Sequence, residues 1–147
     1  MTQRAAGDKK YSLTPLTDSL GFLTRVVQVQ INDCVRANGG LGISPARLSA
    51  LRLVDANPGI RQVDVARFLL IQESNMANLV KDLISEGLVK RRGNKRGGLW
   101  ITGDGRRQVE QAAAAFRIDR SYAAVLSDKE YKHLVKLLNR VYRASLG

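Results

Sequence analysis

Apolar side chains recur every three or four positions in the first quarter of the chain. The residues that follow this spacing are Leu20, Leu23, Val27, Ile31 and Val35. They predict an amphipathic helix that begins near Asp18 and ends at Asn38-Gly39-Gly40. Val26 and Val29 widen its apolar face beyond a single stripe. A face of this width is expected to have a second partner, such as another subunit.

Two shorter helices are predicted between residues 44 and 70. Ser44 and Pro45 are typical of an N-cap and a first helical position, and this helix stops before Asn57-Pro58-Gly59. Its inward positions are Leu48, Leu51 and Val54. The other helix is expected at residues 61–69, and its inward side chains are Val63, Ala66 and Leu70.

A further helix and a hairpin are predicted next. The helix runs from Gln72 to about Glu86, and Gly87 has the place of its C-terminal glycine. Its buried side carries Met76, Leu79, Val80 and Leu83. Two β-prone segments follow at residues 88–91 and 99–102, and between them lie Gly93, Gly97 and Gly98. This arrangement predicts two strands and a flexible tip.

Two helices are expected at the C-terminal end. The first covers about residues 104–122, and its apolar positions are Val109, Ala112, Ala113, Phe116 and Ile118. Ser127 and Glu130 then have the spacing of a capping box. The last helix places one set of apolar residues along a single face: Tyr131, Leu134, Leu138, Val141 and Tyr142.

This order of elements predicts a mainly α fold with a small β-hairpin. Three short helices that end in a basic hairpin form a winged helix-turn-helix. We divide the chain into an N-terminal arm and dimerisation helix (1–40), a DNA-binding lobe (41–103) and C-terminal dimerisation helices (104–147). Apolar faces near both termini that one small domain cannot bury indicate a homodimer.

The charge narrows the choice of partner. The net charge of this 147-residue chain is +11, which predicts attraction to nucleic acid or to an anionic membrane surface. Six of these net charges lie between Gly87 and Arg107. No apolar run reaches the length of about 18 residues that a membrane span needs. The start lacks an apolar signal core and Cys34 is the single cysteine, so a cytoplasmic protein is expected.

Three segments resemble the MarR family of bacterial transcription regulators. They are GISPARLSALRLVDANPG (42–59), QVDVARFLLIQESNMANLVKDLISEGLVKRR (62–92) and LWITGDGRRQV (99–109). The resemblance implies a dimer that binds a pseudo-palindromic DNA site and responds to a small aromatic or acidic effector. The wing of this family usually carries an Asp-Arg pair near its tip. Here the tip, residues 93–98, is shorter and lacks the aspartate, and Arg96 stands for the arginine that enters the minor groove.

The residues expected to contact double-stranded DNA lie on the helix at 72–86 and on the hairpin. On the helix, which would enter the major groove, they are Gln72, Glu73, Ser74, Asn75, Asn78 and Lys81. On the hairpin they are Lys90, Arg91, Arg92, Lys95 and Arg96. Gln and Asn pair with adenine, so A·T pairs are expected in the site. The alternative for Ser74 and Asn75 is that they only cap the helix.

A ligand site and a reactive centre are less clearly indicated. Gln28, Asn32 and Arg47 are polar residues near the expected effector site, and an arginine suits a carboxylate; the alternative is that they are surface or subunit-contact residues. Cys34 is interpreted as a packed thiol rather than a redox sensor. His133 is the single histidine, so no metal site is expected. No cofactor is expected either.

Three other functions remain open from the sequence. A non-specific or architectural nucleic-acid binder without ligand control would carry a similar charge. An enzyme would have to use Cys34 or His133, which lie on helices remote in sequence without a supporting motif. A membrane-surface binder is disfavoured, because the basic cluster lies on a glycine-rich hairpin rather than on an amphipathic helix.

Overall fold

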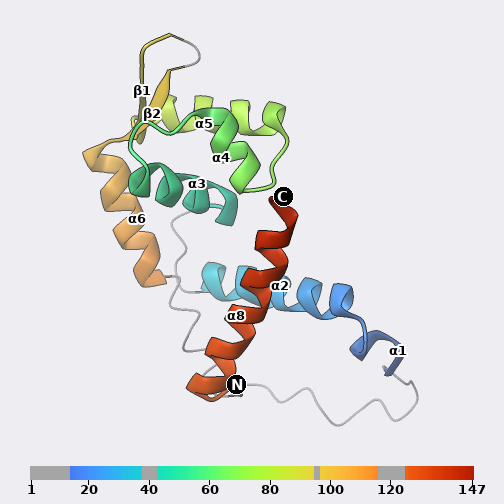
Figure 1. The fold of residues 1–147 in the computed structure, drawn as a ribbon. Coiled ribbons are helices and arrows are strands. Elements are labelled where there is room, and N and C mark those ends of the chain that lie inside the picture. Colours follow the sequence, from blue (N-terminus) through green and yellow to red (C-terminus); the bar gives the residue numbers. More distant parts are fainter. Residues whose placement is uncertain (1–13, 38–42, 95–96, 116–124) are drawn as a thin grey trace.

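A computed structural model describes residues 14–37, 43–94, 97–115 and 125–147. Figure 1 shows the hairpin projecting from one end of the molecule, with α2 and α8 toward the other end. The helices are α1 (Thr14–Thr17), α2 (Leu20–Ala37), α3 (Pro45–Ala56), α4 (Gln62–Phe68), α5 (Glu73–Ser85), α6 (Gly103–Ala115) and α8 (Asp128–Ser145), and the strands are β1 (Val89–Arg92) and β2 (Gly98–Ile101).

The predicted mainly helical fold with a two-stranded hairpin is confirmed. Each strand begins and ends within one residue of the predicted segment. One difference is α1, a short helix at Thr14–Thr17, which lies before the predicted start of the first helix near Asp18, in the segment assigned to the N-terminal arm. The predictions for Asn38 to Gly40, Phe116 and Ile118 concern positions outside the described residues.

Local signals in the sequence explain where several helices begin and end. The Ser44 hydroxyl accepts a hydrogen bond from the backbone N–H of Arg47 at 3.3 Å, and Pro45 is the first residue of α3. Gly87 ends α5 with φ +72°, and the N–H of Leu88 donates to the Leu83 carbonyl at 2.9 Å. This left-handed position is the one that a C-terminal glycine prefers.

The hydrophobic core lies inside the lobe formed by α3, α4, α5 and the hairpin, and α6 packs on α3 and adds the buried Ala112 to it. Its largest fully buried side chains are Leu51, Met76, Leu83, Leu99, Val54, Val65 and Val80. The predicted inward faces of α3 and α5 are therefore confirmed. A short bridge between Ile60 and Leu99 joins the connection before α4 to β2, so the hairpin is attached to the lobe along its second strand.

Two of the three inward positions predicted for α4 are wrong. Val63 is 43% exposed and Leu70 is 61% exposed, whereas Val65 and Ala66 are buried. The inward face of α4 is centred between Val65, Ala66 and Leu69, and Val63 lies on its outer flank. The helix ends at Phe68, so Leu70 does not continue its period. Instead Leu70 turns the chain toward α5 with φ +53°.

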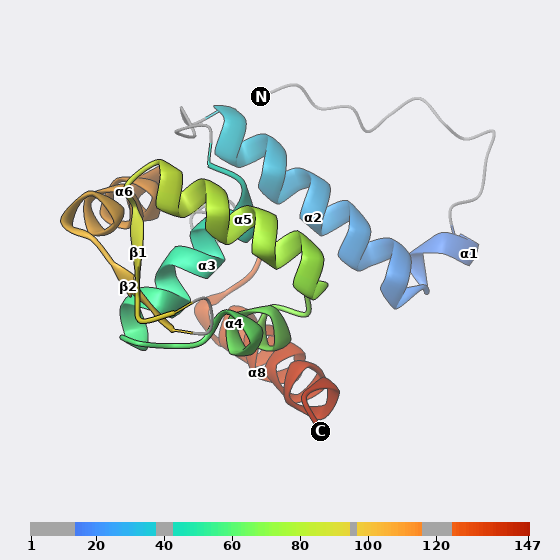
Figure 2. The same cartoon turned by 90° about the horizontal axis from the view of Figure 1, so that it is seen from above.

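The helices outside the lobe leave large apolar side chains at the surface of the single chain. On α2 these are Leu20, Leu23, Val27 and Val29, which are 40–65% exposed. On α8 they are Leu134, Val135, Leu137, Leu138, Val141 and Tyr142. Viewed from above, α2 and α8 lie on different sides of the lobe (Figure 2). These faces agree with the width of the apolar pattern in the sequence.

One hydrogen bond links the last helix to the lobe. The Tyr142 hydroxyl on α8 donates to the Phe68 carbonyl at 2.7 Å, at the end of α4. Tyr142 is 38% exposed, so its hydroxyl contacts the lobe while its ring stays partly exposed to solvent.

Leu70→Gly is expected to give a more stable protein than Leu70→Ala. A residue with a Cβ pays roughly 1–2 kcal/mol in the left-handed region, which glycine avoids. At an ordinary position glycine would instead be less stable than alanine by about 0.5–1 kcal/mol. Chemical denaturation of the two variants measures the difference, and a more stable alanine variant would contradict the strain at this turn.

Candidate nucleic-acid interface

The outer face of α5 is polar and open. Six of its predicted DNA-contacting residues are exposed: Gln72, Glu73, Ser74, Asn75, Asn78 and Lys81. The N-cap of α5 is Gln72, which forms no side-chain capping bond. Ser74 and Asn75 therefore follow the cap as the second and third helical residues, and the alternative that they cap the helix is wrong. Their side chains point outward without a hydrogen-bond partner among the described residues.

The two faces of β1 separate its basic side chains. Successive residues of a strand point to opposite sides, and here Val89 is buried, Lys90 and Arg92 are exposed and Arg91 is half-buried. The pairing of Arg92 with Gly98 across the hairpin places its outer charge near the tip. Lys95 and Arg96, which were also expected to contact DNA, lie outside the described residues.

The Arg91 guanidinium has partners inside the lobe. Its Nη2 donates to the Oε1 of Gln62 at 2.7 Å, and its Nη1 donates to the carbonyl of Gly97 at 3.3 Å. Gln62 is the first residue of α4. The hairpin is thus connected through a side chain to the helix that precedes α5, a contact that the sequence reasoning did not foresee.

Arg92 lies over an aromatic ring rather than free in solvent. Its guanidinium carbon is 4.6 Å from the centroid of the Trp100 ring. Trp100 is half-buried beside Gly59, where an added Cβ would come within 3.3 Å of the ring. A cation over an aromatic face keeps its charge while its position is restricted.

Close backbone contact fixes the base of the hairpin. The N–H of Gly59 donates to the Leu99 carbonyl at 2.8 Å, and the N–H of Leu99 donates to the Ile60 carbonyl at 2.8 Å. A Cβ on Gly98 would lie 2.4 Å from the Gly59 carbonyl oxygen. The position therefore has no room for a side chain.

Gly98→Ala is expected to destabilise the protein by about 1–3 kcal/mol, because the new methyl group must push two backbones apart. Gly103→Ala is the matched control, since its Cβ would meet only the end of the Arg107 side chain at 3.7 Å. Thermal and denaturant unfolding of both variants tests the contact. Equal stabilities would show that the backbones at Gly59 and Gly98 can separate without cost.

The three predicted ligand residues are not brought together. The side-chain amide of Gln28 donates to the Asn32 side-chain oxygen at 3.2 Å, on α2. Arg47, on α3, forms an ion pair with Glu86 at the end of α5. Within the described ranges, no hydrogen bond or ion pair joins Arg47 to Gln28 or Asn32. Their role as a ligand site stays a prediction.

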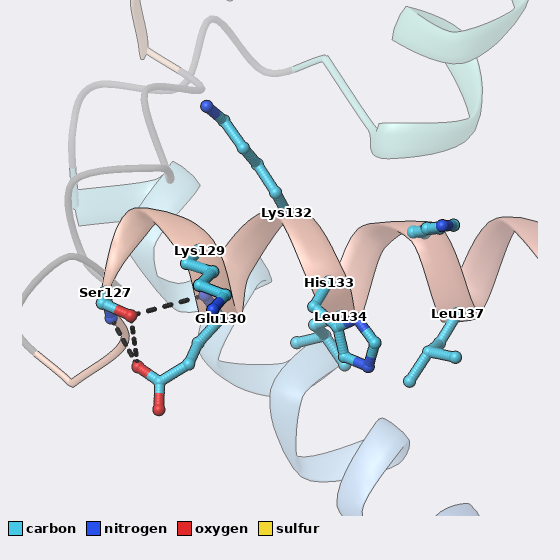
Figure 3. Close-up of a pocket in the computed structure, with 8 residues that line it drawn as sticks. Ser127, Lys129, Glu130, Lys132, His133, Leu134 and Leu137 are labelled. Carbon is cyan, nitrogen blue, oxygen red and sulfur yellow. Dashed lines mark hydrogen bonds between the residues drawn. The ribbon is translucent and has the colours of Figure 1, made fainter.

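A hollow of about 830 Å³ lies along the first half of α8 (Figure 3). Its lining includes Ser127, Lys129, Glu130, Lys132, His133, Leu134, Lys136 and Leu137. All eight side chains are exposed, so this hollow is an open, basic surface. His133 lies on it, but within the described residues no group of three or more His, Cys, Asp or Glu side chains could hold a metal ion.

The one carboxylate in this lining is engaged in capping α8. The hydroxyl and the backbone N–H of Ser127 donate to the Glu130 carboxylate at 2.6 and 2.8 Å. The predicted capping box is confirmed. These bonds, the hydroxyl bond first, lower the pKa of Glu130 below its ordinary value of 4.5. The side chain of Cys34, the other candidate reactive group, lies outside the described part of the chain.

Ser127→Ala is expected to raise the pKa of Glu130 toward its ordinary value, while the backbone bond keeps part of the shift. A lowered carboxyl pKa stabilises the folded state above the ordinary pKa, and this contribution is lost as the pH falls through the folded pKa. The variant should therefore lose less stability on acidification than the wild type does. NMR titration of the Glu130 carboxyl measures the change, Ser127→Thr is the control, and an unchanged pKa in Ser127→Ala would refute the hydroxyl as its main cause.

Comparison with known proteins gives a consistent group of relatives. The profile of the MarR family matches residues 41–98. A protein described as a transcriptional regulator of the hcr operon in Thauera aromatica is 31% identical over 109 residues. That match covers 69% of this chain and 64% of the relative, so the chain spans less than two thirds of that protein's length.

Solved structures share the fold over most of the chain. The repressor CouR from Rhodococcus jostii RHA1, bound to p-coumaroyl-CoA, is 25% identical with a TM-score of 0.76, and the match covers 86% of this chain and 94% of that one. A transcriptional regulator from Pseudomonas aeruginosa is 26% identical with a TM-score of 0.75, and the match covers 86% and 98% of the two chains. Among the described residues, no helix is both long and apolar enough to cross a bilayer.

Proposed function

The chain belongs to the MarR family of transcriptional regulators, and we propose that two copies of it bind a pseudo-palindromic operator and repress transcription until a small effector releases them. The observation that carries the proposal is the shared outer surface of α5 and the hairpin. An open row of polar side chains on a helix lies beside exposed positive charges on a β-ribbon. A helix of this kind fits the major groove, and the ribbon supplies contacts to phosphates.

Base reading would be done by the first two turns of α5. Gln72, Asn75 and Asn78 are exposed amides, and amides pair bidentately with adenine. Glu73, Ser74 and Lys81 complete the polar face. Lys90 and Arg92 on the wing would supply most of the attraction to phosphates, together with Lys95 and Arg96. The affinity is therefore expected to fall with increasing salt, because the release of counterions into a more concentrated salt solution is less favourable.

Dimerisation would bury the apolar faces of α2 and α8. Ten large apolar side chains on these two helices are exposed in the single chain, and burial of such surface drives association. A two-fold dimer presents two reader helices, so the operator is expected to contain half-sites about one helical turn apart. A repressor that acts in this way works in the cytoplasm, on the chromosome.

An aromatic or acidic compound is proposed as the effector. CouR, a repressor whose structure contains p-coumaroyl-CoA, is 25% identical to this chain. The basic hollow on α8 offers Lys129, Lys132 and Lys136 to an anionic group, and Gln28, Asn32 and Arg47 remain the residues predicted from the sequence. The effector would favour one of two arrangements of the reader helices and so shift the population away from the DNA-binding one.

A regulator accounts for these surfaces better than an enzyme does. His133 lies on an open helix face, and no described neighbour forms a hydrogen bond or ion pair with it. A non-specific architectural binder is the second candidate, because the basic wing alone would suit it. The exposed amides of α5 favour sequence-specific binding. Competition by random duplex separates the two, since a specific regulator prefers its operator by about a thousandfold or more.

Asn78→Ala is expected to weaken binding to the operator by about 5- to 150-fold for each half-site, which corresponds to a lost base contact of roughly 1–3 kcal/mol in each subunit. Binding to a scrambled duplex should hardly change. The operator is first located by footprinting the DNA next to the protein's own gene, and the two affinities are then measured by fluorescence anisotropy. Gln111→Ala, on the exposed side of α6, is the control. An equal loss on both duplexes would remove Asn78 from base reading.

A further inference from the structure

We propose that Arg91 is a positioning residue that sets the angle of the wing, and that it is not one of the phosphate contacts. This inference rests on the proposed DNA-binding function and assigns different roles to three consecutive basic residues. Lys90 and Arg92 face outward and carry charge toward the duplex. Arg91 faces the lobe and holds the strand that carries them.

The contacts of Arg91 join three separate parts of the chain. The side chain begins on β1, its Nη2 reaches Gln62 at the first position of α4, and its Nη1 reaches the carbonyl of Gly97, which directly precedes β2. One planar group thus connects the first strand, the end of the wing turn and the helix before the reader. Its half-buried position among these partners leaves it turned away from the outer face that Lys90 and Arg92 occupy.

The guanidinium is suited to this role by its shape. Its five N–H donors are fixed in one plane, so two acceptors in different directions are held at a defined separation. A lysine ammonium carries the same charge on a flexible stem and lacks the planar fork. The Gly97 acceptor lies where the backbone is crowded, because a Cβ on that residue would be 2.0 Å from the Arg92 carbonyl oxygen.

The neighbouring charges depend on this bond for their direction. Arg92 lies over Trp100 on the other face of the hairpin, and Lys90 forms no hydrogen bond or ion pair with any described residue. Both move with β1. Because Gln62 begins α4, and α4 leads through a four-residue connection into α5, the bond also relates the wing to the reader helix. Correct spacing of both on one duplex requires that relation to be kept.

The salt dependence of DNA binding tests this assignment. Lys90→Ala removes one phosphate contact from each subunit of the dimer, so the slope of log K against log salt should become shallower by about 1.8, which is about 0.9 for each contact. Arg91→Ala should lower the affinity by roughly tenfold at moderate salt while the slope stays as in the wild type. Arg91→Lys keeps the charge but not the fork, and it should bind as weakly as Arg91→Ala. A slope change in Arg91→Ala, or full rescue by lysine, would overturn the proposal.

Gln62→Ala supplies an independent arm, because a neutral side chain releases no counterions. It should weaken binding, though no more than Arg91→Ala, which also loses the bond to Gly97. The double variant should bind no more weakly than Arg91→Ala, since the bond to Gln62 is already absent there. A Gln62→Ala variant with wild-type affinity would contradict a role for the hydrogen bond between Arg91 and Gln62. Thermal unfolding of each variant shows that the lobe is folded.

Hydrogen exchange of the free protein separates failure of this inference from failure of the proposed function. In Arg91→Ala and Gln62→Ala, the backbone amides of β1 and β2 should exchange faster than in the wild type, whereas Lys90→Ala should leave them unchanged. This readout needs no DNA. If the wild-type protein binds no duplex, the proposed function fails, and hydrogen exchange alone then tests the bond between Arg91 and Gln62. Unchanged exchange in both variants would overturn the positioning role of Arg91.

Discussion

The geometry of the candidate interface depends on the contact between the backbones of Gly59 and Gly98. A side chain at Gly98 would clash with the Gly59 backbone and would disturb the two hydrogen bonds that join Gly59 and Ile60 to Leu99, whereas a Cβ on Gly59 would press against the Trp100 ring. Because the hairpin has only two strands of four residues each, it has little stability of its own. The hairpin keeps one orientation because the connection before α4 pairs with β2 through the bridge between Ile60 and Leu99, in the manner of a short third strand.

Much of the fold follows from local signals that the sequence states directly. Ser44 with Pro45, Gly87 and the Ser127-Glu130 pair each mark a helix end through contacts with residues a few positions away, and such contacts can be read from spacing. The apolar period likewise identifies the buried sides of α3 and α5. The apolar period does not identify the buried side of α4. This helix has seven residues, which is too short for its inward face to be recognised, and Leu70 lies beyond its end.

The candidate site is predictable only in part, for a related reason. Which residues of α5 are exposed follows from the helical period, since the opposite side must be apolar. The role of Arg91 does not follow from any local pattern, because its partner Gln62 is 29 positions away in the chain. A run of three basic residues in the sequence suggests one common role, whereas the alternation of the strand and a distant acceptor give its members different ones.

The bond between Tyr142 and the Phe68 carbonyl ties the end of α8 to the last residue of α4. Rotation of α8 about its axis would break this bond unless α4 turned with it. The reader helix follows α4 after a four-residue connection, so this bond would link its tilt to the packing of α8. A compound that changes how α8 packs could therefore alter the reader's tilt without touching it, and a chain that lost the hydroxyl would pass on less of that movement.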